Sequence, residues 1–219
     1  EFFASMIIND VRKIIPNFSL CYGGFFCDSS NFKILCDMGA GTNTSYLLME
    51  LVKDAETLGR AIQTPTLPRD LIAEAQEFMN GITQVVVALS YAWRMKKFTH
   101  YDLHVNNVMR YNILSTNFSK LFKGVDIAAK DIPDSVLFRY WGGPDILGKA
   151  SRKPGGEGSI LIPATQLYLI IDYGNSYVEG MPHGTHYERC DRVSVGMTPT
   201  RSKSYFDVFT LAMNSFTFI

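Results

Sequence analysis

Two polar residues set five positions apart have the spacing that most directly suggests chemistry in this sequence. Asp102 and Asn107 lie in the run THYDLHVNN, residues 99–107. In phosphoryl transfer, an Asp at the first position accepts or orients the proton of the attacking hydroxyl, and an Asn at the second binds a magnesium ion on the nucleotide. The spacing therefore predicts a catalytic loop, with Asp102 as a catalytic residue and Asn107 as a magnesium ligand.

A second carboxylate follows an apolar run farther along the chain. Residues 167–171 read LYLII and lead directly into Asp172, Tyr173 and Gly174. A strand that ends in this way places a carboxylate at the end of a sheet, where a metal ion can bind. Asp172 is therefore predicted to be the second magnesium ligand. The simpler alternative is a buried His-Asp pair in an ordinary turn, with an unrelated surface turn at residues 172–174.

The residues around these motifs predict the elements that hold them. From about 70 to 97 the apolar residues, Ile72 and Met79 among them, follow a spacing of three and four, which is typical of a long helix with a core-facing stripe. Asp70 is expected to cap this helix, which should support the run at 99–107 from below. Further helices are expected at 1–15, at 56–62 and from about 204 onward, and strands at 18–27 with a turn or bulge at Gly23-Gly24, at 45–52, at 108–114 and at 167–171.

Taken together, the two motifs resemble the catalytic loop and the metal-binding Asp-Phe-Gly of the protein kinase superfamily. The resemblance implies ATP and Mg²⁺ as cofactors and an α+β, bilobal kinase-like fold that is incomplete in this chain. Residues 1–52 would form the last part of the small lobe, and residues 53–219 the first half of the large lobe. The two motif Asp residues are seventy positions apart, whereas kinases commonly have about twenty, so residues from about 115 to 160 are expected to be an insertion.

The same resemblance implies an adenine-binding edge. The run Met49-Glu50-Leu51-Val52 is similar to a kinase strand end and hinge, in which the carbonyl of Glu50 and the backbone of Val52 would bind the purine. Met49 would close the back of that pocket, and Glu56 would meet the ribose hydroxyls. A plain edge strand with a polar exit stays open as the alternative.

Other residues take expected roles from the resemblance. His100 would orient the catalytic loop through hydrogen bonds, and Asp207 would hold the backbone of that loop. Glu1, at the start of the first helix, would be the partner of a strand Lys. His104 stands where many Ser/Thr kinases have Lys, and Asp-Leu-His is closer to haspin-like and aminoglycoside-phosphotransferase-like kinases. The acceptor hydroxyl could therefore belong to a protein or to a small molecule.

A narrower resemblance rests on four stretches. They are VRKIIPNF at 11–18, YGGFFC at 22–27, the run from His100 to Asn107, and the run from Ile170 to Gly174. Together they are similar to kinase-like proteins of large DNA viruses such as iridoviruses. This similarity implies a viral protein that is intracellular, in the host cytoplasm, or part of the virion.

Three functions are therefore weighed. The first is an ATP- and Mg²⁺-dependent Ser/Thr protein kinase, whose partners would be protein substrates or virion proteins. The second is a pseudokinase that serves as a structural component of a viral particle, since the sequence has no Gly-rich phosphate loop and neither Lys33 nor Lys53 has the context of the phosphate-binding Lys. The third is a small-molecule kinase.

The composition limits the classes of partner that the protein is expected to bind. Lys+Arg and Asp+Glu both number 21, and the formal net charge of +0 argues against a direct nucleic-acid binder that relies on a basic field. The sequence is 47% hydrophobic, enough for a sizeable core, yet it has no apolar run long enough to predict a membrane span. Four cysteines, without zinc-type spacing, are expected to be mostly buried free thiols. They are Cys21, Cys27, Cys36 and Cys190.

Overall fold

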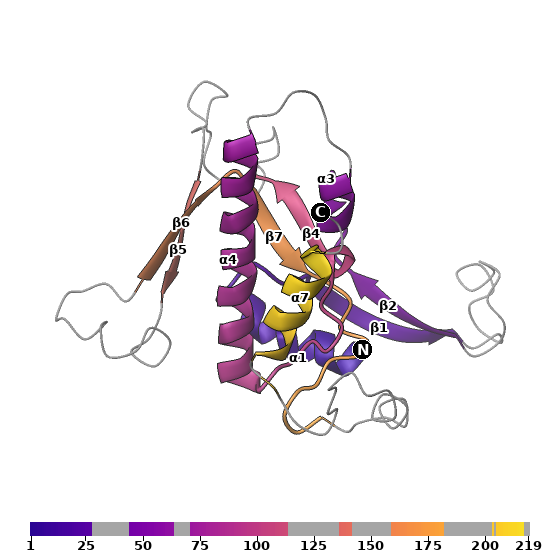
Figure 1. Ribbon diagram of the computed structural model, residues 1–219. Helices are drawn as coiled ribbons and strands as arrows, with labels where there is room; N and C mark the ends of the chain where they lie inside the picture. Colours follow the sequence, from indigo (N-terminus) through magenta and orange to yellow (C-terminus); the bar gives the residue numbers. More distant parts are fainter. Residues whose placement is uncertain are drawn as a thin grey trace, which may run out of the picture.

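The computed structural model combines helices with small antiparallel sheets, a mixed α+β architecture. It describes residues 1–27, 44–63, 71–113, 136–141, 159–181, 203 and 205–216. In Figure 1 the long helix α4 (Leu71–Lys96) stands beside a central sheet, and two strand pairs project on opposite sides of the view. The predicted cap Asp70, the Gly-rich run at 154–158 and the segment at 182–202 lie outside the described residues.

Helix α1 (Phe2–Arg12) forms because its apolar residues recur on one face. Ala4, Ile8 and Val11 are buried, at spacings of four and three, and face the core. The helix ends before Pro16, as predicted, although the last residues of the expected 1–15 span form turns.

The first sheet pairs β1 (Cys21–Cys27) with β2 (Thr44–Met49) in antiparallel register. The register shifts between Cys21 and Gly23, and Gly23 has φ +154°, a conformation that glycine adopts without strain. The predicted bulge is therefore confirmed. The predicted strand at 45–52 was too long, because pairing with β1 ends at Met49.

The central sheet has the order β3-β4-β7 and is antiparallel throughout. Its strands are β3 (Glu56–Thr57), β4 (Val108–Asn112) and β7 (Gln166–Ile170). The helix predicted at 56–62 is corrected by this pairing: residues 56 and 57 join β4, and helix α3 (Leu58–Gln63) begins only after them. The short helix η1 (Val105–Asn107) leads into β4.

A further strand pair joins the sequence interval expected as an insertion, at about 115–160, to the residues that follow it. Strand β5 (Val136–Trp141) pairs antiparallel with β6 (Ser159–Ala164), and β7 begins two residues after β6 ends. Contacts between α4 and β6 attach this pair to the body of the molecule; for example, the Asn80 amide donates to the Pro163 carbonyl at 2.6 Å.

Helix α4 confirms the predicted long helix, but only part of its predicted stripe is core. Val85 and Leu89 are buried, whereas Ile72 and Met79 are 82% and 57% exposed. A helix of 26 residues is about 39 Å long, whereas a five-residue strand such as β7 spans about 17 Å. The first turn of α4, around Ile72, therefore extends past β7. Met79 lies level with that strand, since Glu77 accepts from the Gln166 N–H and Gly81 lies against Tyr168, so its exposure means that it faces away from the sheet.

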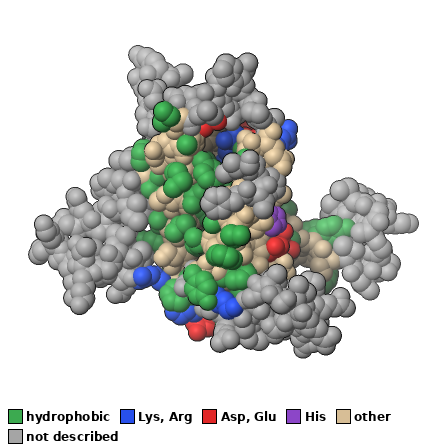
Figure 2. Space-filling model, viewed as in Figure 1, with side chains coloured by type: hydrophobic (Ala, Val, Ile, Leu, Met, Phe, Trp, Pro, Cys, Tyr) green, Lys and Arg blue, Asp and Glu red, His purple; other side chains and the backbone are tan. Residues whose placement is uncertain are grey.

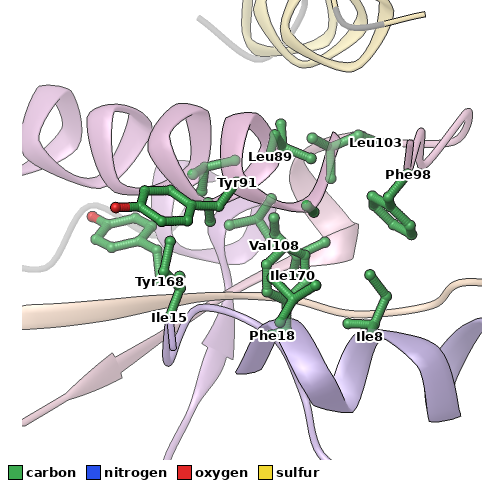
Figure 3. Close-up of a cluster of buried hydrophobic side chains, with 14 of the residues drawn as sticks. Ile8, Ile15, Phe18, Leu89, Tyr91, Phe98, Leu103, Val108, Tyr168 and Ile170 are labelled. Carbon is green, nitrogen blue, oxygen red and sulfur yellow. The ribbon is translucent and has the colours of Figure 1, made fainter. Parts of the chain in front are cut away.

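The core lies between α1, α4 and the central sheet. Figure 3 shows Ile8, Phe18, Val108 and Ile170 gathered between α1 and α4, and Leu89 belongs to the same buried cluster. All five are buried, so the residues that follow α1 and precede β1 are part of the same core as the sheet. Burial of this kind is the main favourable term that holds the fold together.

A buried polar cluster joins α4 to β7 within that core. The Asn17 amide donates to Gln84 Oε1 at 3.1 Å and to the Tyr168 carbonyl at 2.8 Å. Gln84 Oε1 also accepts from the Tyr168 N–H, and its amide donates to the Gln166 carbonyl. Both side chains are fully buried, and these bonds offset the cost of removing their polar groups from water.

One glycine in α4 makes close approach possible. A Cβ on Gly81 would collide with the ring of Tyr168, so at this point the helix backbone lies directly against that buried ring. Only glycine has the space for this contact.

Helix α7 (Phe206–Phe216) lies beside α4. Figure 2 shows apolar side chains on this face of the molecule. Two apolar residues of α7, Phe209 and Met213, are 61% and 52% exposed. Between the two helices is a hollow of about 300 Å³. It is lined by Val86, Leu89, Ser90, Trp93, Arg94 and Val208.

The structure bears on two expectations from composition, one about the cysteines and one about membrane spans. Cys21 is a buried free thiol, as predicted. Among the helices in the described part of the chain, none has the length and apolar character needed to cross a bilayer.

Candidate functional site

The loop between α4 and η1 is held from beneath by a buried carboxylate. Asp207, in the first turn of α7, accepts from the His100 N–H at 2.7 Å and from the Tyr101 N–H at 2.9 Å. Tyr101 has φ +63°, a strained conformation for a residue with a side chain, which persists only where its surroundings fix it. The role predicted for Asp207 is confirmed by these two bonds. Burial raises the pKa of Asp207, while the nearby His100 and the two N–H donors oppose that rise.

His100 links the loop to the end of β7. Its ring is fully buried, Nδ1 accepts from the Asp102 N–H at 3.3 Å, and Nε2 lies 2.9 Å from the Ile171 carbonyl. Because Nδ1 accepts, the proton is on Nε2, which donates to that carbonyl. The arrangement agrees with the orienting role expected for His100.

Asp172 follows β7 in a turn that is fixed at several points. The Ile171 N–H donates to the Asn107 carbonyl at 3.0 Å, which brings the two motifs side by side. Asp172 has φ +62°, and its Oδ1 accepts from the Gly174 N–H at 3.2 Å. A Cβ on Gly174 would lie 4.0 Å from the Glu1 carboxylate, so the start of α1 is also close to this turn.

Tyr173 anchors that turn in the core. Its hydroxyl donates to the Ile170 carbonyl at 2.8 Å and accepts from the Ser19 N–H at 3.0 Å. Its ring meets His100 edge-on at 6.0 Å between ring centres. Burial raises the pKa of Tyr173, so the hydroxyl stays neutral and donates.

Asn107 is positioned by Asp102. Its side-chain amide donates to the Asp102 carbonyl at 2.9 Å, and the residue is buried, with an exposed fraction of 6%. Since the amide nitrogen has this partner, Oδ1 is the end of the side chain suited to a cation. Asp102, Asn107 and Asp172 are therefore tied into one constellation through His100 and Ile171.

The donor set suits magnesium. Mg²⁺ is commonly bound by one or two protein oxygen ligands together with waters and substrate phosphates. Asn107 would supply an amide oxygen, and the exposed Asp172 a carboxylate oxygen. In the ranges that the structure describes, no three His, Cys, Asp or Glu side chains gather into a closed metal cluster.

The carboxylate of Asp102 has a partner that the sequence motifs did not indicate. The Asn175 side-chain amide donates to Asp102 Oδ2 at 3.0 Å. The available signal was only its place directly after Asp-Tyr-Gly, where an amide is within reach of the other motif.

The residues predicted to bind the nucleotide have different surroundings. Both carboxylate oxygens of Glu50 accept from Arg12, at 2.9 and 2.7 Å, and Oε2 also accepts from the Leu20 N–H at 3.1 Å. Glu56 pairs with Arg110 at 2.8 and 2.6 Å. These carboxylates therefore have protein partners.

Met49 and Val52 are partly buried. Met49 ends β2 and packs against the main core, and Val52 packs against Tyr111 and Ile113. The Val52 carbonyl accepts from the Ala55 N–H at 3.4 Å. The adenine- and ribose-binding roles of Met49, Glu50, Val52 and Glu56 stay predictions.

Comparison with known proteins gave matches among solved structures. No family model matches the chain, and no curated protein matches it. Among solved structures, the crystal structure of the PF14_0431 kinase domain is similar, with 17% sequence identity and a TM-score of 0.37. The likeness covers 83% of this chain and 41% of that one, so the chain spans less than half of that domain's length.

Proposed function

We propose that this chain belongs to an ATP- and magnesium-dependent phosphotransferase of the protein kinase-like superfamily. One observation carries the proposal: Asn107 is bonded both to Asp102 within its own motif and to the residue before Asp172 in the other motif. Its amide bonds the carbonyl of Asp102, and its own carbonyl accepts from Ile171, directly before Asp172. The three polar residues that phosphoryl transfer needs are therefore held in one place by two separate parts of the sequence.

Each residue has a definite task in this proposal. Asp102 orients the acceptor hydroxyl and takes its proton while the hydroxyl oxygen bonds to the γ-phosphorus and the bond from that phosphorus to ADP breaks. Asn107 and Asp172 would hold magnesium, which neutralises charge on the phosphates. His100 and Asp207 keep the loop in its strained conformation, so the geometry exists before substrate arrives.

The acceptor proposed is a Ser or Thr hydroxyl on a protein, inside a host cell or in a virion. An alcohol on a small molecule is the competing acceptor, because the Asp-Leu-His run also resembles kinases of that class. The same active site serves both, so the choice depends on the acceptor and is made by experiment.

The test uses the full-length natural protein with ATP labelled at the γ-phosphate and Mg²⁺. Casein and histone serve as protein acceptors, and a set of aminoglycosides as small alcohols. Transfer to the proteins that Asp102→Asn and Asp172→Ala abolish supports the proposal, and transfer to aminoglycosides alone replaces its acceptor class. If Asp172→Ala transfers phosphate as fast as the natural protein, the assignment is wrong.

A binding or scaffold function is the second candidate, and one observation favours it. Glu50 and Glu56, both on the predicted nucleotide edge, are engaged by Arg12 and Arg110. Titration of the full-length protein with ATP and Mg²⁺ by calorimetry separates the two functions, since a scaffold without a nucleotide site gives no binding heat.

A further inference from the structure

The segment after Asp-Tyr-Gly runs antiparallel to the segment that enters the catalytic loop. Three backbone hydrogen bonds pair them: the Glu179 N–H to the Lys96 carbonyl at 3.1 Å, the Tyr177 N–H to the Thr99 carbonyl at 2.8 Å, and the Thr99 N–H to the Tyr177 carbonyl at 3.0 Å. In an antiparallel pair, each step back along one segment is a step forward along the other. This register places Ser176 opposite His100 and Asn175 opposite Tyr101, next to Asp102 in the chain.

The backbone position of Asn175 is fixed by its neighbours in the chain. Ser176 is fully buried, with its hydroxyl 3.5 Å from the His100 carbonyl, and Tyr173 is anchored in the core by its own hydroxyl. Between these two points the chain has little freedom. The contact of 3.0 Å from the Asn175 amide to Asp102 Oδ2 is therefore set by the backbone on both sides.

We propose that Asn175 is a positioning residue for Asp102: its amide holds Oδ2, which leaves Oδ1 to receive the proton of the acceptor hydroxyl. The inference rests on the proposed phosphotransferase function and adds to it a residue outside both motifs. A carboxylate that is held by one oxygen keeps a single orientation, which is what a catalytic group needs. In this proposal Asn175 acts through Asp102 and does not itself contact the nucleotide.

The first test is Asn175→Ala in the full-length protein. Loss of a hydrogen bond to a charged group should lower kcat by about tenfold, while the affinity for ATP with Mg²⁺ stays within about twofold. Asn80→Ala is the matched control, because the Asn80 amide donates to Pro163 on the β6 side of α4, and its kcat should equal that of the natural protein. Asn175→Ala with unchanged kcat, in a protein that Asp102→Asn inactivates, overturns the inference and leaves the proposed function standing.

The second test is Asn175→Asp, whose effect should depend on pH. At about pH 8 the introduced carboxylate repels that of Asp102, and kcat should fall by about a hundredfold. Two adjacent carboxylates share a proton more readily than one binds it alone, so toward about pH 6 the introduced group is protonated and can donate to Oδ2. The ratio of natural to variant kcat should therefore shrink by about tenfold across this range. A ratio that is constant with pH contradicts the inference.

His100, Asp172 and Glu1 also lie around the turn, and each is present in both proteins. A loss of packing caused by the substitution would lower kcat equally at every pH, so it is distinguished from the positioning role.

A third measurement does not need turnover. In the full-length protein, Asp102→Asn should shift the NMR signals of the Asn175 side-chain amide protons, because it replaces the charged acceptor of their hydrogen bond. If the natural protein transfers no phosphate to any acceptor, the proposed function fails, and this measurement still decides the contact. Signals that Asp102→Asn leaves unchanged overturn the inference in either case.

Discussion

The side of the molecule that is proposed to be catalytic, called the catalytic side below, and the predicted nucleotide edge are held by different kinds of contact. On the catalytic side, defined here as residues 98–107 with 170–176, buried groups such as Asp207 and Tyr173 hold backbone N–H and carbonyl groups. On the nucleotide edge, residues 49–56, the carboxylates pair with arginines whose side chains are about a quarter exposed.

This difference predicts which of the two regions tolerates substitutions. A buried polar group that loses its partner costs the full desolvation of what remains, whereas a partly exposed ion pair contributes less. We therefore expect the catalytic side to lose activity and stability on small changes, and the nucleotide edge to accept them. The following predictions test this comparison, from the largest expected effect to the smallest.

Asp172→Ala should produce the largest change. The phosphotransfer rate should fall by about a thousandfold or more, because charge neutralisation at the phosphates supplies much of the catalysis. Asp172 is exposed, so the free energy of unfolding should change by less than about 1 kcal/mol. Steady-state kinetics and urea denaturation of the full-length protein measure the two quantities, and a large stability loss with normal turnover would reverse the assignment.

Asp207→Ala should reduce both stability and activity. It leaves the N–H groups of His100 and Tyr101 buried without their acceptor, at a cost of about 3 kcal/mol in the free energy of unfolding. Tyr101 should then leave its strained conformation, and turnover should fall with it. Thr210→Ala on the same helix, whose hydroxyl bonds only the Asp207 carbonyl, is the control and should change either quantity little. If the two variants lost the same free energy of unfolding in urea denaturation, the two bonds that Asp207 accepts would not be what holds the loop.

Tyr173→Phe should have a moderate effect with a pH signature. Loss of the hydroxyl bonds to Ile170 and Ser19 should cost about 1–2 kcal/mol. Burial raises the pKa of Tyr173, so the unfolded chain releases its proton at about pH 10 while the folded chain keeps it. Stability from this group is complete below that pH and is lost as pH rises through the folded pKa.

The natural protein should therefore lose stability more steeply above about pH 10 than the Phe variant does. Thermal unfolding followed across pH 8 to 11 measures this. Tyr168 is also buried and raised in pKa, so some alkaline loss remains in both proteins. Parallel curves for the two proteins would show that the Tyr173 hydroxyl ionises in the folded state as readily as in the unfolded one.

Glu50→Gln and Glu56→Gln should have the smallest effect on the fold. Each weakens a partly exposed ion pair with Arg12 or Arg110 and should cost about 1 kcal/mol or less, with the difference shrinking in high salt. Calorimetric titration with ATP and Mg²⁺ sharpens the comparison. If Glu56 meets the ribose, Glu56→Gln lowers nucleotide affinity and Glu50→Gln does not. A stability loss as large as that of Asp207→Ala would remove the distinction between the two regions.

Local patterns were enough to predict the catalytic side in outline. The helical spacing gave α4 to within a residue at each end, and the distance between Asp102 and Asn107 marked the loop, because both signals depend on neighbours in sequence. The same patterns failed at β3, where pairing with β4 overrides the helical tendency of two residues. They also failed for Ile72 and Met79, since a helix period says neither how far the facing sheet extends nor how wide the buried face of the helix is.

Contacts between distant segments had no such signal. The amide of Asn175 and the hydroxyl of Tyr173 reach residues 73 and 154 positions away, and nothing periodic connects them. The ion pair of Glu50 with Arg12 spans 38 positions for the same reason. Such pairs follow from the fold once it is known, and they explain why the surroundings of the nucleotide edge differed most from a reading of the sequence alone.

The close approach of α4 to Tyr168 has a consequence for protein engineering. Replacing a helical glycine by alanine is a common way to stabilise a protein, because it gains about 1 kcal/mol in helix propensity. At Gly81 the added methyl group would enter the volume of the Tyr168 ring and push the helix off the sheet. A thermostabilised version of this protein should therefore keep glycine at position 81, even though helix propensity alone favours alanine there.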